Sequence, residues 1–271
     1  FYKYNLCNKK KLDYIFSNHK FDYIYHFAAF SSVKLSLENP FKVIRNNVDS
    51  TKNLIFYTNK FKIKNFIFSS SASIYGNIKF KNNIKEISKL KPINAYGRSK
   101  LLCERIIKNK IKKRFSQYCI FRYFNVVGRH ISNLVIKKKN LNLFESIYFA
   151  IKNKKTFYIN GKNLNTIDGT PIRDFITVDD IVNAHLECIH QKKNKKFWNK
   201  SFNVGIDKGL SVLQIIKECN KMMKYKIRYI LVDSNKGEIE KSIADNSKFL
   251  KFSNWKPKFT KTNKIFRSFF K

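Results

Sequence analysis

The chain has 271 residues, of which 43% are hydrophobic, and a formal net charge of +38 at pH 7. Its size and apolar content suffice for one large domain or two modest ones, and no apolar run reaches membrane-spanning length. The charge suggests a nucleic-acid partner. However, 47 of the 56 basic residues are Lys and only 9 are Arg, and phosphates are recognised best by the forked guanidinium group of Arg. We attribute the charge to lysine-rich composition, and expect weak polyanion binding but no specific nucleic-acid or membrane partner.

The five cysteines and five histidines lack the spacing of metal ligands, so we predict no metal site. The odd number of cysteines favours buried thiols in a reducing compartment over disulfides. No signal-peptide pattern opens the chain, so we expect a cytoplasmic protein.

In the first half of the chain, short apolar runs alternate with longer amphipathic stretches. We expect the end of a strand at 1–6 and full strands at 22–29, 65–71 and 117–125. Between them we expect helices at 9–18 and 40–61, and a third that carries Tyr96 and Lys100 and continues through Ile107. This alternation predicts a parallel, doubly wound sheet.

From about residue 128 the pattern loosens. The expected elements are a basic loop at 129–143, a helix at 144–153, a strand at 156–160, a helix capped by Asp179 or Asp180, a strand at 202–205 and a helix capped by Ser211. The predicted fold class is therefore α/β, with a doubly wound parallel (Rossmann-type) sheet and a smaller α+β substrate domain.

Tyr96 and Lys100 are four residues apart, so a helix places both side chains on one face, one turn apart. The lysine cation would lower the pKa of the phenol and make it a general base near neutral pH. By itself the pair is more typical of an exposed polar helix start than of a catalytic site. The upstream strand ends in three serines, and ligands of open α/β sheets bind at the carboxyl ends of strands. Ser71, Tyr96 and Lys100 are therefore candidates for proton handling beside a dinucleotide.

Six motifs, in order along nearly the whole chain, resemble the extended short-chain dehydrogenase/reductase family and, within it, the sugar-nucleotide 4-epimerases. They are His26-Phe27-Ala28-Ala29, Asn46-Asn47-Val48, Phe68 to Gly76, Tyr96 with Lys100, Arg122-Tyr123-Phe124-Asn125 with Gly128, and Arg173-Asp174-Phe175-Ile176. The family's dehydratases and decarboxylases carry an acidic residue just past the serine strand. Ala72-Ser73 stands there in this chain, which favours epimerase chemistry.

The resemblance implies that NAD oxidises the sugar of UDP-glucose or UDP-galactose transiently at C4 and returns the hydride to the opposite face. It implies that Tyr96 takes the proton of the 4-hydroxyl, Lys100 lowers the pKa of Tyr96 and binds the nicotinamide ribose, and Ser71 hydrogen-bonds the reacting oxygen. The implied cofactor contacts are Asn5, Leu6, Phe27, Ala28, Ala29, Phe30, Ser31, Asn46, Ser69, Tyr96, Lys100 and Phe124. The implied substrate contacts are Ser71, Tyr96, Asn125 and Arg173.

The resemblance also implies a division of the chain. We expect an NAD-binding domain at 1–127, rejoined by 176–206, and a mainly UDP-sugar-binding region at 128–271. It further implies a homodimer formed through the helices near 41–60 and 95–110. Local sequence leaves other roles open for the contact residues: Asn46 as a solvated helix face, Asn125 as a turn residue, Arg173 paired with Asp174 or Asp179, and Tyr123 and Phe124 as core.

The chain also departs from the family pattern. The family opens with a strand and a glycine-rich turn that holds the pyrophosphate, and none of the eight glycines of this chain forms such a turn. We therefore expect a fragment that lacks roughly fifty residues before Phe1, about one and a half βαβ units, and that binds NAD poorly on its own.

Further departures lie toward the C-terminus. An arginine pair of the family is replaced by Ser234-Asn235-Lys236 before Gly237-Glu238, and a family tyrosine by Ser242. The family's Asn-Asn substrate loop maps onto Asn140 or Asn142. Two other functions stay open: an epimerase of another UDP-sugar, such as an N-acetylhexosamine or pentose form, and a non-catalytic protein that binds sugar nucleotides or polyanions.

Overall fold

The computed structural model describes residues 1–77, 82–128, 142–222, 226–234, 239–262 and 264–265. The chain forms two compact units. The first consists of residues 1–76, 89–123 and 188–202, and the second of residues 77–88, 124–187 and 203–271. The assignment of NAD to 1–127 and of the UDP-sugar to 128–271 stays a prediction.

A four-stranded sheet is the centre of the first unit. Its strands are β1 (Tyr23–His26), β2 (Asn65–Ser71), β3 (Gln117–Tyr123) and β7 (Lys200–Val204), in the order β1-β2-β3-β7. β2 runs parallel to both β1 and β3, with Ser71 paired to Tyr123 at the carboxyl end. Phe66, Phe68 and Ile120 are buried, as expected of parallel strands covered on both faces.

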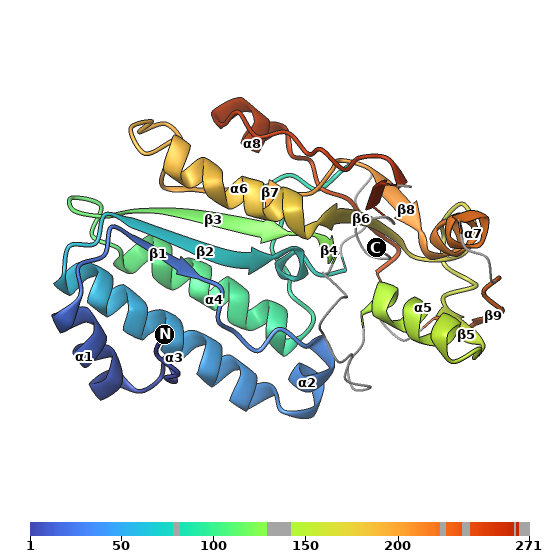
Figure 1. The fold of residues 1–271 in the computed structure, drawn as a ribbon, viewed down its shortest axis with the longest axis horizontal. Coiled ribbons are helices and arrows are strands. Elements are labelled where there is room, and N and C mark those ends of the chain that lie inside the picture. The colour runs from blue at the N-terminus through green and yellow to red at the C-terminus, as the bar shows by residue number, and fades with distance from the viewer. Residues whose placement is uncertain (78–81, 129–141, 223–225, 235–238, 263, 266–271) are drawn as a thin grey trace. The chain divides into compact units, whose positions relative to one another are not determined.

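The helices of the first unit are α1 (Lys9–Asn18), α2 (Val33–Glu38), α3 (Pro40–Lys60) and α4 (Ala95–Lys110), with a short 3₁₀ helix, η1 (Ala72–Ile74), after β2. α3 and α4 lie side by side on one face of the sheet (Figure 1). The core fills the space between them and the strands, and Phe16 of α1 stacks on Tyr57 of α3 at 4.8 Å. Burial of the apolar side chains of this core stabilises the packing of the helices on the sheet.

The start of α4 is fixed by two local devices. The Asn94 side chain caps the helix by accepting a hydrogen bond from Gly97 N at 2.8 Å. Gly97 has to be glycine, because a Cβ there would lie 2.5 Å from the carbonyl oxygen of Ser73. The first turn of α4 therefore packs directly on the backbone of η1, at the carboxyl end of β2.

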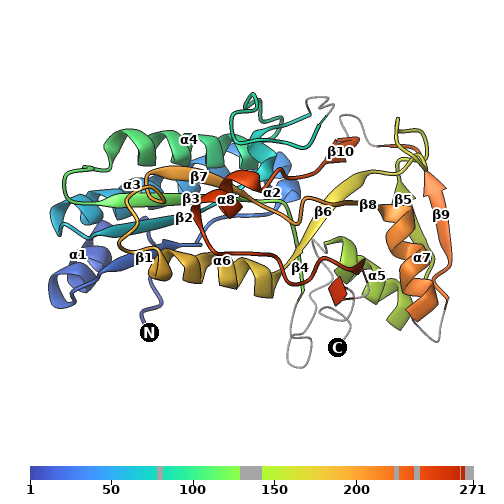
Figure 2. The same ribbon diagram turned by 90° about the horizontal axis from the view of Figure 1, so that it is seen from above.

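In the second unit, β6 (Ile172–Thr177) pairs in parallel with β4 (Asn125–Val127) and β10 (Lys241–Ser242), and antiparallel with β8 (Gly209–Ser211). β5 (Phe157–Asn160) and β9 (Tyr229–Val232) form a separate parallel pair. The helices are α5 (Leu143–Lys152), α6 (Val178–His190), α7 (Val212–Met222) and α8 (Ser247–Phe252). α5 and α7 lie beside the β5–β9 pair (Figures 1 and 2).

Three sequence-based expectations about these elements are wrong. Residues 1–5 form no strand, because a strand needs a ladder partner and no described segment pairs with them. α6 begins at Val178, and the Thr177 hydroxyl rather than an aspartate caps it, accepting from Asp180 N at 3.1 Å. The strand expected at 117–125 is interrupted at Phe124, which separates β3 from β4.

Other expectations hold. Ser211 caps α7 by accepting a hydrogen bond from Gln214 N at 3.0 Å. The parallel sheet with flanking helices confirms the predicted α/β, Rossmann-type class. Most of the expected basic loop at 129–143 lies outside the described residues. Among the described helices, none combines the length and the apolar character that a membrane crossing requires.

Candidate functional site

The structure brings Ser71, Tyr96 and Lys100 together at the carboxyl end of β2. Tyr96 and Lys100 lie one turn apart on α4, and the Lys100 ammonium is 5.9 Å from the centre of the Tyr96 ring. The phenol of Tyr96 hydrogen-bonds with the Ser71 hydroxyl. Lys100, which is only 3% exposed, donates a hydrogen bond to the backbone carbonyl of Ser69 at 2.6 Å.

The surroundings shift the pKa of both ionisable groups of this set. Burial raises the pKa of Tyr96, and the hydrogen bond from Ser71 opposes that change. Burial lowers the pKa of Lys100 to about 8, against the effect of neighbouring Cys103 and Glu104. Lys100 is therefore still mostly a cation at neutral pH, one turn from the phenol. The lowered Tyr96 pKa expected from the sequence is not found in this structure, because burial raises it.

A buried ion pair under this set was not indicated by the sequence. Glu104 accepts hydrogen bonds from Arg122 Nε at 3.0 Å and Arg122 Nη2 at 2.7 Å, and both side chains are almost fully buried. The Ser70 hydroxyl also donates to Glu104, at 2.6 Å. The available signal was an arginine inside the otherwise apolar run of β3, since a buried arginine needs a carboxylate partner.

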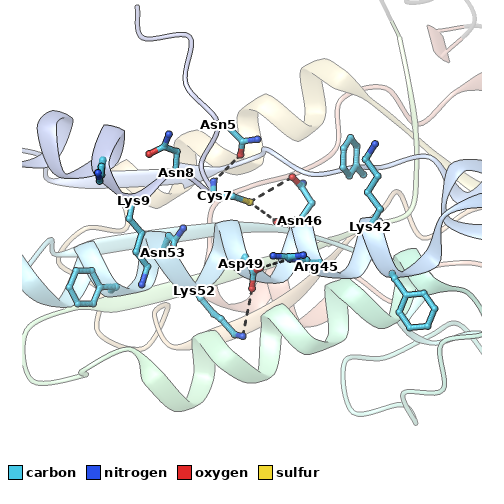
Figure 3. A pocket seen from close by; sticks show the side chains of 14 residues that line it. Asn5, Cys7, Asn8, Lys9, Lys42, Arg45, Asn46, Asp49, Lys52 and Asn53 are labelled. Atoms are coloured by element: carbon cyan, nitrogen blue, oxygen red, sulfur yellow. Dashed lines mark hydrogen bonds and ion pairs between the residues drawn. The ribbon is translucent and has the colours of Figure 1, made fainter.

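Three predicted cofactor contacts line one cavity of about 1290 Å³ in the first unit, namely Asn5, Phe30 and Asn46 (Figure 3). Asn46 also accepts a weak hydrogen bond from the Cys7 thiol, at 3.7 Å to its carbonyl and 3.8 Å to its side chain. It is half-buried, which argues against a merely solvated helix face. The cationic lining residues are Lys9, Lys10, Lys42, Arg45 and Lys52.

The chemistry of this lining fits a dinucleotide. Four carboxamides, Asn5, Asn8, Asn46 and Asn53, face the cavity with those five cations, against one carboxylate, Asp49. Cations favour an anionic ligand, and carboxamides offer both donors and acceptors to a base or a ribose. Leu6 adjoins the same lining, because its carbonyl accepts a hydrogen bond from Asn53 Nδ2 at 2.9 Å.

The loop after β1 carries the remaining contacts predicted near the strand end, and Asn47 holds it. Asn47 Oδ1 accepts from Phe30 N at 2.8 Å, and Asn47 Nδ2 donates to Phe30 O at 3.1 Å and to Ser99 Oγ at 2.9 Å. Phe27 is 56% exposed at the end of β1. The small residues Ala28 and Ala29, with Ser31, complete this loop and leave room for a flat ligand to approach the backbone.

The remaining predicted contacts belong to the second unit. Phe124 is buried, and its backbone N–H donates to Val204 O at 3.3 Å, as the core interpretation expected. Asn125 is exposed and begins β4, so it is a strand residue rather than a turn residue. Arg173 Nη1 donates to the carbonyl oxygens of Ile172 at 3.0 Å and Ile239 at 2.6 Å.

The carboxylate next to Arg173 has other partners. Asp174 is fully buried and accepts backbone hydrogen bonds from Ile206, Asp207 and Ala244. This geometry argues against the surface pair with Arg173 that local sequence allowed. Ser242, which replaces the family tyrosine, pairs with Arg173 across β10 and β6.

The substrate loop is only partly visible. Asn142 caps α5 in a reciprocal capping box with Glu145. Asn140 lies outside the described residues, as do Asn235, Lys236, Gly237 and Glu238.

A parallel sheet that presents serine, tyrosine and lysine together at its carboxyl edge defines the class: an α/β enzyme of the short-chain dehydrogenase/reductase type. The model of the NAD dependent epimerase/dehydratase family matches residues 1–205, and the chain belongs to this family. The family predicted from the sequence motifs is therefore confirmed.

Individual relatives agree. The chain is 34% identical over 261 residues to the UDP-glucose 4-epimerase of Dictyostelium discoideum, covering 94% of this chain and 76% of that protein. The structure is similar to that of UDP-glucose 4-epimerase from Bifidobacterium longum in complex with NAD+ and UDP, with TM-score 0.86 and 29% identity over 98% of this chain and 80% of that one. It is also similar to the UDP-Glc/GlcNAc 4-epimerase from Campylobacter jejuni, with TM-score 0.83 and 35% identity over 99% and 82% of the two chains.

Proposed function

We propose that this chain interconverts UDP-glucose and UDP-galactose, with NAD as its cofactor. The observation that carries the proposal is the set formed by Ser71, Tyr96 and Lys100. A phenol, a hydroxyl and a buried ammonium lie near one another at the end of β2. A protein that only bound sugar nucleotides would have no need of a base placed beside a buried cation. The names of the relatives support the same reaction.

In this mechanism the chain handles the proton of the sugar 4-hydroxyl. Tyr96, as phenolate, takes that proton and later returns it to the same oxygen. Ser71 hydrogen-bonds the reacting oxygen, and Lys100 favours the phenolate through its positive charge. When bound, NAD would supply the hydride acceptor and donor for C4, and its positive charge would favour the phenolate of Tyr96 further.

We assign to NAD the residues of the first unit that line or adjoin the cavity, together with the loop after β1, Ser69, Tyr96 and Lys100. Asn125 and Arg173 are assigned to the UDP part of the substrate. Arg173 is held in place by two backbone carbonyls. Its planar, rigid guanidinium group therefore suits the binding of a diphosphate.

The proposal includes a homodimer formed through α3 and α4. Leu102, a large apolar side chain of α4, is 38% exposed and available for such a contact, whereas Phe41 and Phe56 of α3 line the cavity assigned to NAD. Sedimentation equilibrium distinguishes this dimer from a monomer. The five free cysteines, four of them buried and only Cys7 exposed, support a reducing compartment such as the cytoplasm.

The test is turnover by the purified chain with added NAD. UDP-galactose should appear from UDP-glucose, and UDP-glucose from UDP-galactose, as resolved by chromatography. UDP-N-acetylglucosamine and a UDP-pentose are run in parallel. Conversion of only one of these other sugars would transfer the function to that substrate, and binding of UDP-sugars without any conversion would favour the non-catalytic alternative.

The mechanism predicts a falling alkaline limb in the pH profile of kcat. Because the pKa of Lys100 is lowered to about 8, the ammonium loses its proton above that pH and ceases to favour the phenolate. We expect kcat to decline with a midpoint near pH 8 in rapid assays at saturating substrate. A kcat that stays level to about pH 10, where an unperturbed lysine titrates, would contradict this role of Lys100.

A further inference from the structure

The three serines at 69–71 each contact a different turn of α4. The carbonyl of the first accepts from Lys100 at 2.6 Å, the hydroxyl of the second donates to Glu104 at 2.6 Å, and the hydroxyl of the third bonds with Tyr96. Tyr96, Lys100 and Glu104 follow one another at intervals of four residues, so they form one stripe on the helix. The carboxyl end of β2 is thus joined to α4 at three successive turns.

Glu104 is the most rigidly held member of this stripe. Its carboxylate receives two parallel hydrogen bonds from Arg122, a geometry that fixes both position and plane. The third arm of that guanidinium donates to the hydroxyl of Tyr75 at 2.8 Å, just after η1. Lys108 approaches the other side of the carboxylate at 3.2 Å. β2, β3 and α4 therefore meet at one buried ion pair, and the residue after η1 contacts it through Arg122.

Glu104 also carries a negative charge one helical turn from the Lys100 ammonium. Burial alone would raise the pKa of Glu104, but the hydrogen bonds and charge of Arg122 outweigh it and hold the pKa below its usual value. The other titratable groups facing Lys100 are Tyr96, whose pKa is raised by burial, together with Cys103 and His26. Burial raises the pKa of the Cys103 thiol and lowers that of His26 to about 3, so both are neutral near pH 7.

We propose that Glu104, clamped by Arg122, is a positioning residue for Tyr96 and Lys100: it fixes the register of α4 against the end of β2, and its buried charge keeps Lys100 an ammonium. Nothing in the proton transfer itself requires Glu104 to touch substrate or cofactor. The consequence for catalysis rests on the proposed epimerase function, whereas the register and the charge coupling are properties of the fold alone.

A double-mutant cycle on unfolding tests the charge coupling without any assay of activity. The parent, Glu104→Gln, Lys100→Met and the double variant are unfolded in urea at about pH 7 and about pH 9.5, on either side of the Lys100 pKa. The coupling should be favourable at the lower pH and fall by more than about half at the higher, because Lys100 loses its proton while Glu104 stays ionised. A cycle built with Glu104→Asp in place of Gln should show little coupling, since Asp keeps the charge that interacts with Lys100.

The matched control is Asp49→Asn, which removes an exposed carboxylate on the neighbouring helix α3. Combined with Lys100→Met it should show no coupling at either pH. A Glu104–Lys100 coupling that is absent, or equal at both pH values, would overturn the charge part of the proposal and leave Glu104 as packing only.

Hydrogen exchange tests the register of α4 against the end of β2. It uses a less disruptive variant, in case Glu104→Gln does not fold. Ser70→Ala removes one bond to Glu104 and keeps every charge. Amides in the first two turns of α4 should exchange faster in Ser70→Ala than in the parent and be unchanged in Asp49→Asn. Unchanged protection in Ser70→Ala would overturn the register part. If the variants show the coupling and the exchange effect, but the parent shows no epimerase turnover, the proposed function fails and this inference stands.

Discussion

Replacement of Tyr96 by Phe should lower kcat by about 10²–10⁴-fold while binding of NAD and UDP-sugar is retained, because only the proton acceptor is lost. The phenyl ring keeps the volume that packs on α4, and only the hydrogen bond with Ser71 disappears. The measurement is steady-state turnover of UDP-galactose, together with calorimetric binding of NAD and of UDP.

The control for this change is Tyr14→Phe, the same deletion on a tyrosine that is 55% exposed on α1. It should leave kcat unaltered. If Tyr96→Phe kept more than about a tenth of the parent kcat, the proton would have to leave by another route, and the role of Tyr96 as base would be wrong.

Replacement of Arg122 by Met should be the most destabilising single change discussed here, at about 3–5 kcal/mol, because it leaves the buried Glu104 without its principal partner. Met fills much of the same volume, so the loss comes mainly from the charge and the hydrogen bonds rather than from a cavity. Urea unfolding at about pH 7 measures the loss, with Arg105→Met, an exposed arginine of α4, expected to stay within about 0.5 kcal/mol.

The pH dependence of this loss has a definite sign. In the parent, the folded-state pKa of Glu104 is below its ordinary value, so the stability it contributes is present above that value and is lost as pH falls through the folded pKa. Without Arg122, burial dominates and the folded-state pKa rises, so the carboxyl group takes up a proton more readily. The deficit of Arg122→Met should therefore be smaller at about pH 5 than at about pH 7, and a deficit independent of pH would contradict the ion-pair account.

The helix that carries Tyr96 and Lys100, and the strand that delivers Ser71, could be predicted from the sequence because both depend on local order. A spacing of four residues aligns two side chains on any helix, and an apolar run that ends in serines indicates a strand with its polar edge. The motifs around them also sufficed to indicate the family. The same reasoning failed at residues 1–5, where a strand-like composition has no ladder partner among the described residues.

The ion pair of Glu104 with Arg122 and the contacts of Asn47 with Phe30 and Ser99 were decided by the tertiary structure alone. These partners lie 18, 17 and 52 residues apart, on elements that meet only once β2, β3, α3 and α4 have packed. The sequence did not indicate this ion pair, because pairing across elements depends on register rather than on spacing along the chain. The sequence by itself therefore indicated the candidate catalytic set of this protein, and only the packed fold determined what holds that set in place.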